Sequence, residues 1–114
     1  MRKIVLLVAM LAMVLATATV AYAAVKNGNA ADNYIRETCN NDTLRGYGGD
    51  DTIDANNCRN VGDVDRLSGG SGNDRLLAND GDALDGLSGG PGYDTCVVDR
   101  RAELNGGCNR ILVR

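Results

Sequence analysis

The chain has 114 residues, with 12 Lys and Arg against 15 Asp and Glu, and a formal net charge of −3. This acidic balance argues against nucleic acid or an anionic membrane surface as a partner, and it favours a cation. The chain has 15 Gly but no His, Trp or Phe, so we expect one small domain with a thin core.

The first residues have the pattern of an export signal. Arg2 and Lys3 precede an uncharged apolar run from residue 4 to residue 25. Ala21-Tyr22-Ala23 fits the small-x-small pattern of a cleavage site, so residues 1–23 are predicted to be a signal peptide and the protein to be secreted. A transmembrane anchor is the alternative, because the run is long enough to span a bilayer. Its second half is mostly Ala and Thr, which favours cleavage.

Residues 24–38 form a polar N-terminal segment for which disorder is left open. Beyond it, a glycine-rich turn that ends in Asp occurs three times, in GYGGDDTID, GGSGNDRLL and GGPGYDTCV. In each case the triplet after the Asp has an apolar residue at its centre. A second Asp-x-apolar triplet stands nine residues before each of these, at Asp42, Asp65 and Asp85. The chain therefore contains three modules, each made of two nine-residue units.

A nine-residue unit with one apolar position does not fit an amphipathic helix, which needs apolar residues at i, i+3, i+4 and i+7. It fits a short strand and a turn in which glycine supplies the unusual backbone angles. Two units then make one coil of a flattened solenoid. Stacking of coils is expected to align six inward side chains: Leu44, Ile53, Leu67, Leu76, Leu87 and Cys96.

GGSGNDRLL and GGPGYDTCV match the nonapeptide G-G-x-G-x-D-x-U-x, with U a large apolar residue, and GYGGDDTID departs from it only at Tyr47. Residues 40–98 thus resemble the RTX, or haemolysin-type, calcium-binding repeat family. The resemblance implies an all-β fold, a short right-handed parallel β-roll of about three coils over residues 39–98. A signal-peptide helix would precede the roll, and residues 99–114 would form a C-terminal cap.

The same resemblance implies that Ca²⁺ is held between neighbouring turns, because calcium takes 6–8 oxygen ligands and one turn cannot supply them. Three turns enclose two gaps, so two strong sites are expected. The side-chain ligands would be Asp51, Asp74 and Asp94, and the turn glycines would be Gly46, Gly48, Gly49, Gly69, Gly70, Gly72, Gly89, Gly90 and Gly92. Asp42, Asp65 and Asp85 are second-rank candidates, because their half-units lack the glycine spacing. Ordinary Asp/Gly turns without a metal are the alternative.

Four cysteines in an exported chain predict two disulfides. Cys39 and Cys58 are 19 residues apart, about one coil, and residues one coil apart stack within disulfide reach. A Cys96–Cys108 bond would fold the chain back over the last coil as a cap. This pairing is one of three possible ones. Zinc is the alternative use of four cysteines, and the lack of His and of a CxxC pair argues against it.

No catalytic group is predicted, because the chain lacks His and its serines have no neighbouring base. The expected function is that of a secreted calcium-binding β-roll, a structural or binding module and not an enzyme. No nucleic-acid partner is expected, no stable membrane insertion after cleavage, and a protein or polysaccharide partner is left open. The alternatives are a calcium-folded fragment of a secreted hydrolase or toxin, or a cell-surface adhesin.

Overall fold

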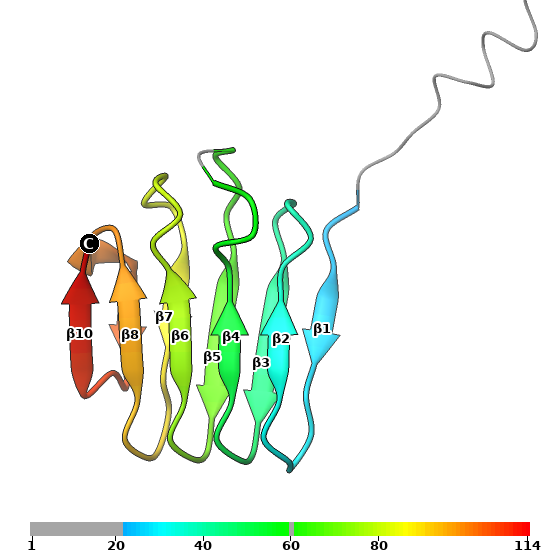
Figure 1. Ribbon diagram of the computed structural model, residues 1–114, viewed down its shortest axis with the longest axis vertical. Coiled ribbons are helices and arrows are strands. Elements are labelled where there is room, and N and C mark those ends of the chain that lie inside the picture. Colours follow the sequence, from blue (N-terminus) through cyan, green and yellow to red (C-terminus); the bar gives the residue numbers. More distant parts are fainter. Residues whose placement is uncertain (1–21, 60) are drawn as a thin grey trace, which may run out of the picture.

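A computed structural model describes residues 22–59 and 61–114 and shows a parallel β-solenoid of two five-stranded sheets (Figure 1). The odd sheet contains β1 (Val25–Asn27), β3 (Thr43–Tyr47), β5 (Arg66–Gly70), β7 (Gly86–Ser88) and β9 (Leu104–Gly106), in this order. The even sheet contains β2 (Tyr34–Arg36), β4 (Thr52–Asp54), β6 (Arg75–Ala78), β8 (Thr95–Val98) and β10 (Arg110–Val113). One short 3₁₀ helix, η1 (Arg101–Glu103), precedes β9.

The chain alternates between the two sheets, so each coil turns at two edges. The glycine edge, at the bottom of Figure 1, carries tight turns at residues 28–33, 46–51, 69–74, 89–94 and 106–109. The loop edge, at the top, carries connections of unequal length at residues 37–42, 55–65, 79–85 and 99–103. The sequence resemblance concerned the glycine edge, and the irregular spacing of the modules is absorbed at the loop edge.

The core is a double row of aliphatic side chains between the sheets. In the odd sheet Leu44 pairs with Leu67, which pairs with Leu87. In the even sheet Ile53 pairs with Leu76, which pairs with Cys96. All six predicted inward residues are buried, none more than 2% exposed, which confirms the predicted inward face. Strand alternation explains this, since every second residue of a strand faces the same side.

The prediction of about three coils was too low, because five strands in each sheet make about four turns. The additional strands lie outside residues 39–98. β1 and β2 occupy the segment 24–38, for which disorder had been left open, and β9 and β10 lie in the expected cap. Asn33 and Asn109 stand in these outer coils where the inner coils have Asp, and this substitution hid the repeat.

The two disulfides have the expected pairing. Cys39 and Cys58 are joined at the loop edge, with their Cα atoms 5.2 Å apart. Cys96 and Cys108 are joined with a Cα separation of 5.8 Å, and they tie β8 to the last turn of the glycine edge. Each bond therefore holds one end region of the solenoid to its neighbouring coil.

The first coil places a charged residue at a core position. Lys26 is paired with Leu44 in the strand register, so it lies on the inward side of β1. Its ammonium group donates a hydrogen bond to the carbonyl of Arg36, across the end of the solenoid. The apolar stem of Lys26 covers the end of the core while its charge is satisfied by a backbone oxygen.

The expected signal peptide, and the membrane anchor considered as its alternative, lie almost wholly outside the described residues. Within residues 22–59 and 61–114, no helix has the length and hydropathy needed to span a membrane.

Candidate metal centre

At the glycine edge, the predicted aspartates stack as one column, with Asn33 and Asn109 at its two ends. From Asp51 onward, each member accepts the backbone N–H of its neighbour one coil before. Asp51 Oδ1 accepts from Asn33 at 2.7 Å, and Asp74 Oδ1 accepts from Asp51 at 2.8 Å. Asp94 Oδ1 accepts from Asp74 at 2.8 Å, and Asn109 Oδ1 accepts from Asp94 at 2.9 Å. One carboxylate oxygen of each Asp is thus committed to the scaffold.

The other oxygen of each Asp is buried and has no hydrogen-bond partner among the described residues. This holds for Asp51 Oδ2, Asp74 Oδ2 and Asp94 Oδ2. A buried carboxylate oxygen without a donor is unfavourable, since burial removes its water. The column therefore leaves three anionic oxygens free for a further ligand.

A glycine keeps room beside each of these free oxygens. A Cβ at Gly69 would lie 2.3 Å from Asp74 Oδ2 and 2.6 Å from the carbonyl oxygen of Gly89, in the next turn. The same arrangement recurs at Gly46, where the corresponding distances to Asp51 Oδ2 and the Gly69 carbonyl are 2.2 and 2.5 Å. A carboxylate oxygen of one turn and a carbonyl oxygen of the next thus converge, because no side chain separates them.

The second-rank aspartates form a matching column at the loop edge. Asp65 Oδ1 accepts the N–H of Asp42 at 2.7 Å, and Asp85 Oδ1 accepts the N–H of Asp65 at 2.8 Å. Both Oδ1 atoms of this pair are used in this way, and both Oδ2 atoms are buried without a partner in the described part of the chain. In the first of these coils, Asp42 Oδ2 instead accepts the N–H of Thr38.

Around this second column the structure gathers more carboxylates than the repeat predicts. Three groups have one ligand oxygen from each member within 4.8 Å of the others. They are Glu37 with Asp63 and Asp65, Asp63 with Asp80 and Asp82, and Asp82 with Asp85 and Glu103. Asp63 and Asp82 each belong to two groups. We call these seven residues the loop-edge row.

Burial raises the pKa of several carboxyl groups in this row. The pKa of Glu37 is raised to about 7 and that of Asp63 to about 6, with nearby carboxylates adding to the effect. Burial likewise raises the pKa of Asp80 to about 6 and that of Asp85 to about 8. In the metal-free protein these groups hold protons more tightly than exposed carboxyl groups do.

The structure places the predicted aspartates at two different edges of the solenoid. Asp51, Asp74 and Asp94 lie in the column that was expected, but the groups of three carboxylates form elsewhere. Of the second-rank candidates, Asp65 and Asp85 belong to the loop-edge row. Its remaining members were not predicted: Glu37, Asp63, Asp80, Asp82 and Glu103. A signal was present in the density of acidic residues between 63 and 85, but it carried no repeat phase.

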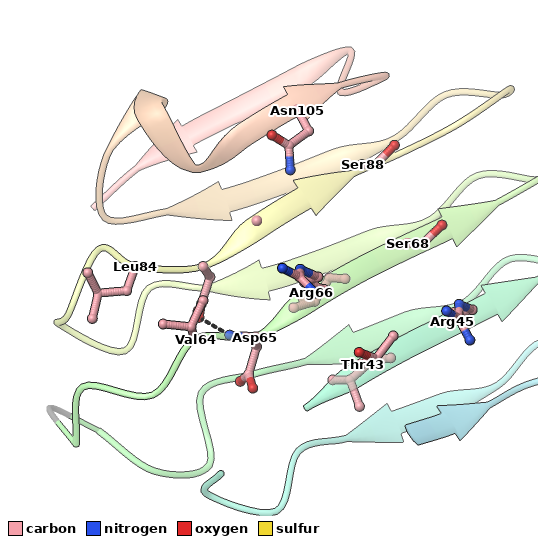
Figure 2. Close-up of a pocket in the computed structure, with 13 residues that line it drawn as sticks. Thr43, Arg45, Val64, Asp65, Arg66, Ser68, Leu84, Ser88 and Asn105 are labelled. Atoms are coloured by element: carbon pink, nitrogen blue, oxygen red, sulfur yellow. Dashed lines mark hydrogen bonds between the residues drawn. The ribbon is translucent and has the colours of Figure 1, made fainter. Parts of the chain in front are cut away.

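The outer face of the odd sheet has a shallow groove of about 430 Å³ (Figure 2). Arg45 and Arg66 project over it from neighbouring strands, and Val64 and Leu84 lie at its end toward the loop edge. Gly86 lines the groove without a side chain, and a Cβ there would lie 2.9 Å from Asn105 Nδ2. Neither Arg45 nor Arg66 forms an ion pair with a residue of the described ranges.

No protein-family model matches the chain, and no match was found among curated proteins or among solved structures.

Proposed function

We propose that the protein is a secreted calcium-binding β-roll, in which ions held between successive coils stabilise the solenoid as a structural or binding module. The observation that carries this proposal is the repeated placement of a partnerless carboxylate oxygen beside the carbonyl oxygen of the next turn. Calcium is the ion this ligand chemistry favours, since it accepts 6–8 carboxylate and carbonyl oxygens in flexible geometry.

Three coils repeat this placement at the glycine edge, at Gly46, Gly69 and Gly89. Beside Gly89, Asp94 Oδ2 and the Gly107 carbonyl oxygen lie 2.7 and 2.3 Å from the Cβ position. The resemblance of residues 40–98 to RTX repeats supports calcium at this edge. Two gaps, between the turns 46–51 and 69–74 and between 69–74 and 89–94, are bordered by Asp on both sides.

Export is the second part of the proposal. The two disulfides favour an oxidising compartment, where such bonds persist. The N-terminal sequence pattern favours a Sec-type signal peptide. Mass spectrometry of secreted material is expected to give a chain that begins at Ala24, and intact Met1 in the membrane fraction would favour the anchor instead.

A calcium titration of the purified, oxidised protein tests ion binding directly. Calcium is expected to raise the melting temperature and sharpen the transition followed by circular dichroism, because an ion that binds only the folded chain stabilises it. Magnesium, which demands smaller octahedral sites, is expected to do less at the same concentration. An equally high melting temperature in excess chelator would refute the proposal.

The groove on the odd sheet favours one alternative, a cell-surface adhesin that binds an acidic polysaccharide. Arg45 and Arg66, which form no ion pair within residues 22–59 and 61–114, are complementary to carboxylate groups. Gly86→Thr would place in the groove the residue that Thr43 supplies at the aligned position of β3. If the alternative holds, this variant stays folded in calcium and loses retention of the parent on immobilised polyuronate. Equal retention of the two proteins would reject it.

A further inference from the structure

We propose that the loop-edge row is a second cation centre, in which two or three divalent ions bridge carboxylates from successive loops. This centre is separate from the glycine edge and is built mostly from residues outside the nonapeptide pattern. The inference rests on the proposed function only in its choice of calcium as the ion.

The geometry forms a chain of shared ligands. Asp63 joins the group of Glu37 and Asp65 to the group of Asp80 and Asp82. Asp82 in turn belongs to the group that contains Asp85 and Glu103. Each group offers three oxygens within 4.8 Å of one another, which is the spacing of ligands around one ion. The shared residues place neighbouring ions next to each other along the solenoid.

The free oxygens in these groups supply an observation independent of the clustering. Every member of the row has at least one buried oxygen without a partner among the described residues. Asp65 is fully buried, and Glu37 and Asp63 are 3% and 6% exposed. Asp63 stands out, because neither of its oxygens has a described partner. Natural proteins rarely leave such atoms unpaired, so a bound cation is the physical explanation we favour.

The scaffold holds the committed oxygens in place and leaves the free ones facing the groups. Glu37 Oε1 accepts the N–H of Cys58 at 2.8 Å, and the Cys39–Cys58 disulfide fixes the same two loops. Glu103 Oε2 accepts the N–H of Arg100 at 2.9 Å, at the start of η1. Both ends of the row are thus fixed by backbone hydrogen bonds. In the middle of the row, Asp63 joins the first group to the second.

No Lys or Arg of the described ranges forms an ion pair with the row. The one ion pair of the described residues joins Arg36 to Asp54, and neither belongs to the row. Protonation of the carboxyl groups is the competing way to neutralise them. The two explanations differ in what happens when a carboxylate is replaced by an amide. An amide removes the negative charge and one anionic ligand oxygen, which weakens ion binding, but it leaves protonated neighbours undisturbed.

The test compares Asp63→Asn with the parent in two measurements. Removal of Asp63 breaks no hydrogen bond of the described structure, so the variant is expected to fold and to melt no lower than the parent in chelator. Equilibrium dialysis against calcium is expected to show fewer bound ions per chain, with affinity at the loop edge reduced at least tenfold. Asp99→Asn is the matched control, because Asp99 lies at the same edge, outside the row, and accepts the Gly81 N–H.

Asp74→Asn separates the two edges and is expected to reduce binding at the glycine edge while the loop-edge ions remain. If Asp63→Asn binds as many ions as tightly as the parent, the second centre is refuted and the proposed function survives. If the parent binds no calcium, the proposed function and this inference both fail. A variant of Asp63 that melts lower than the parent in chelator would also contradict the inference, since it would reveal a structural role.

Discussion

Replacement of Asp74 by Ala and by Asn is expected to separate the two roles of the central aspartate. Its Oδ1 accepts the buried N–H of Asp51, while its Oδ2 has no partner in the described part of the chain. Asn retains an oxygen for the scaffold bond and loses the charge. Ala loses both. Asn is already present in this column, because Asn109 accepts the Asp94 N–H with its side-chain oxygen and Asn33 donates its backbone N–H to Asp51.

The magnitude follows from the bond that Ala removes. A buried N–H left without an acceptor costs about 1–3 kcal/mol, so Asp74→Ala should be less stable than Asp74→Asn by that amount in chelator. Burial raises the pKa of Asp74, and repulsion by Asp94 and Asp51 adds to this effect. A charge at this position is therefore unfavourable in chelator, so Asp74→Asn should be at least as stable there as the parent.

In calcium the two variants should converge. Asp74 borders turns on both sides, so each variant should weaken two glycine-edge sites, whereas Asp51→Asn or Asp94→Asn should weaken mainly one. Urea unfolding in chelator and calorimetric calcium titration measure the two effects separately. Asp50→Asn is the control, because Asp50 is exposed and accepts the N–H of Asn73 in the adjacent column. Equal stability of Asp74→Ala and Asp74→Asn in chelator would refute the scaffold role, and equal calcium affinity of all variants would refute the ligand role.

Three other predictions concern the metal-free scaffold. In chelator, stability against urea should be higher at pH 5 than at pH 8. Burial raises the folded-state pKa of Glu37 to about 7 and that of Asp85 to about 8, so stability that is present below the ordinary carboxyl pKa is lost as the pH rises through these values. A urea midpoint that increases with pH would contradict this. Gly69→Ala should destabilise the protein by about 1–3 kcal/mol through overpacking. Gly48→Ala should be neutral or stabilising in the same urea assay, because the atom nearest to its Cβ would lie 3.4 Å away. Equal effects of the two substitutions would refute the close approach of neighbouring atoms at Gly69. Tyr47→Gly should raise the free energy of unfolding by about 0.5–1 kcal/mol, because Tyr47 has a φ of 73°, in the left-handed region that glycine adopts without strain, as the aligned Gly70 does at 89°. A lower melting temperature of the variant would show that the Tyr side chain stabilises the fold by more than its backbone strain destabilises it.

The sequence predicted the parts of the fold that depend on local phase. A short strand needs only one inward residue, so Leu44, Ile53 and Leu76 could be placed in the core from their position after an Asp. The Cys39–Cys58 disulfide followed from the same phase, since these residues differ by about one coil, whereas the Cys96–Cys108 disulfide was expected as a cap over the last coil. Tyr47 interrupted the motif, yet it adopts the left-handed backbone that the motif assigns to glycine.

The parts that could not be predicted depend on polar equivalence or on loop conformation. Asn33 and Asn109 occupy column positions at which the motif requires Asp, so the motif did not identify the outer coils. Asp63 and Asp82 lie in connections of unequal length, and their approach depends on how each loop crosses the edge. Repeat phase contains no information on that path, whereas burial and proximity in three dimensions reveal it.

Lys26 at the open end of the core has a consequence for self-association. The terminal strand of a parallel solenoid exposes backbone donors and acceptors, and an apolar end would let molecules add to one another as a growing fibre. An ammonium group at a core position makes such end-to-end growth unfavourable, since a second copy stacked there would bury its charge. The first coil thus completes the solenoid and also disfavours the addition of a second copy at this end.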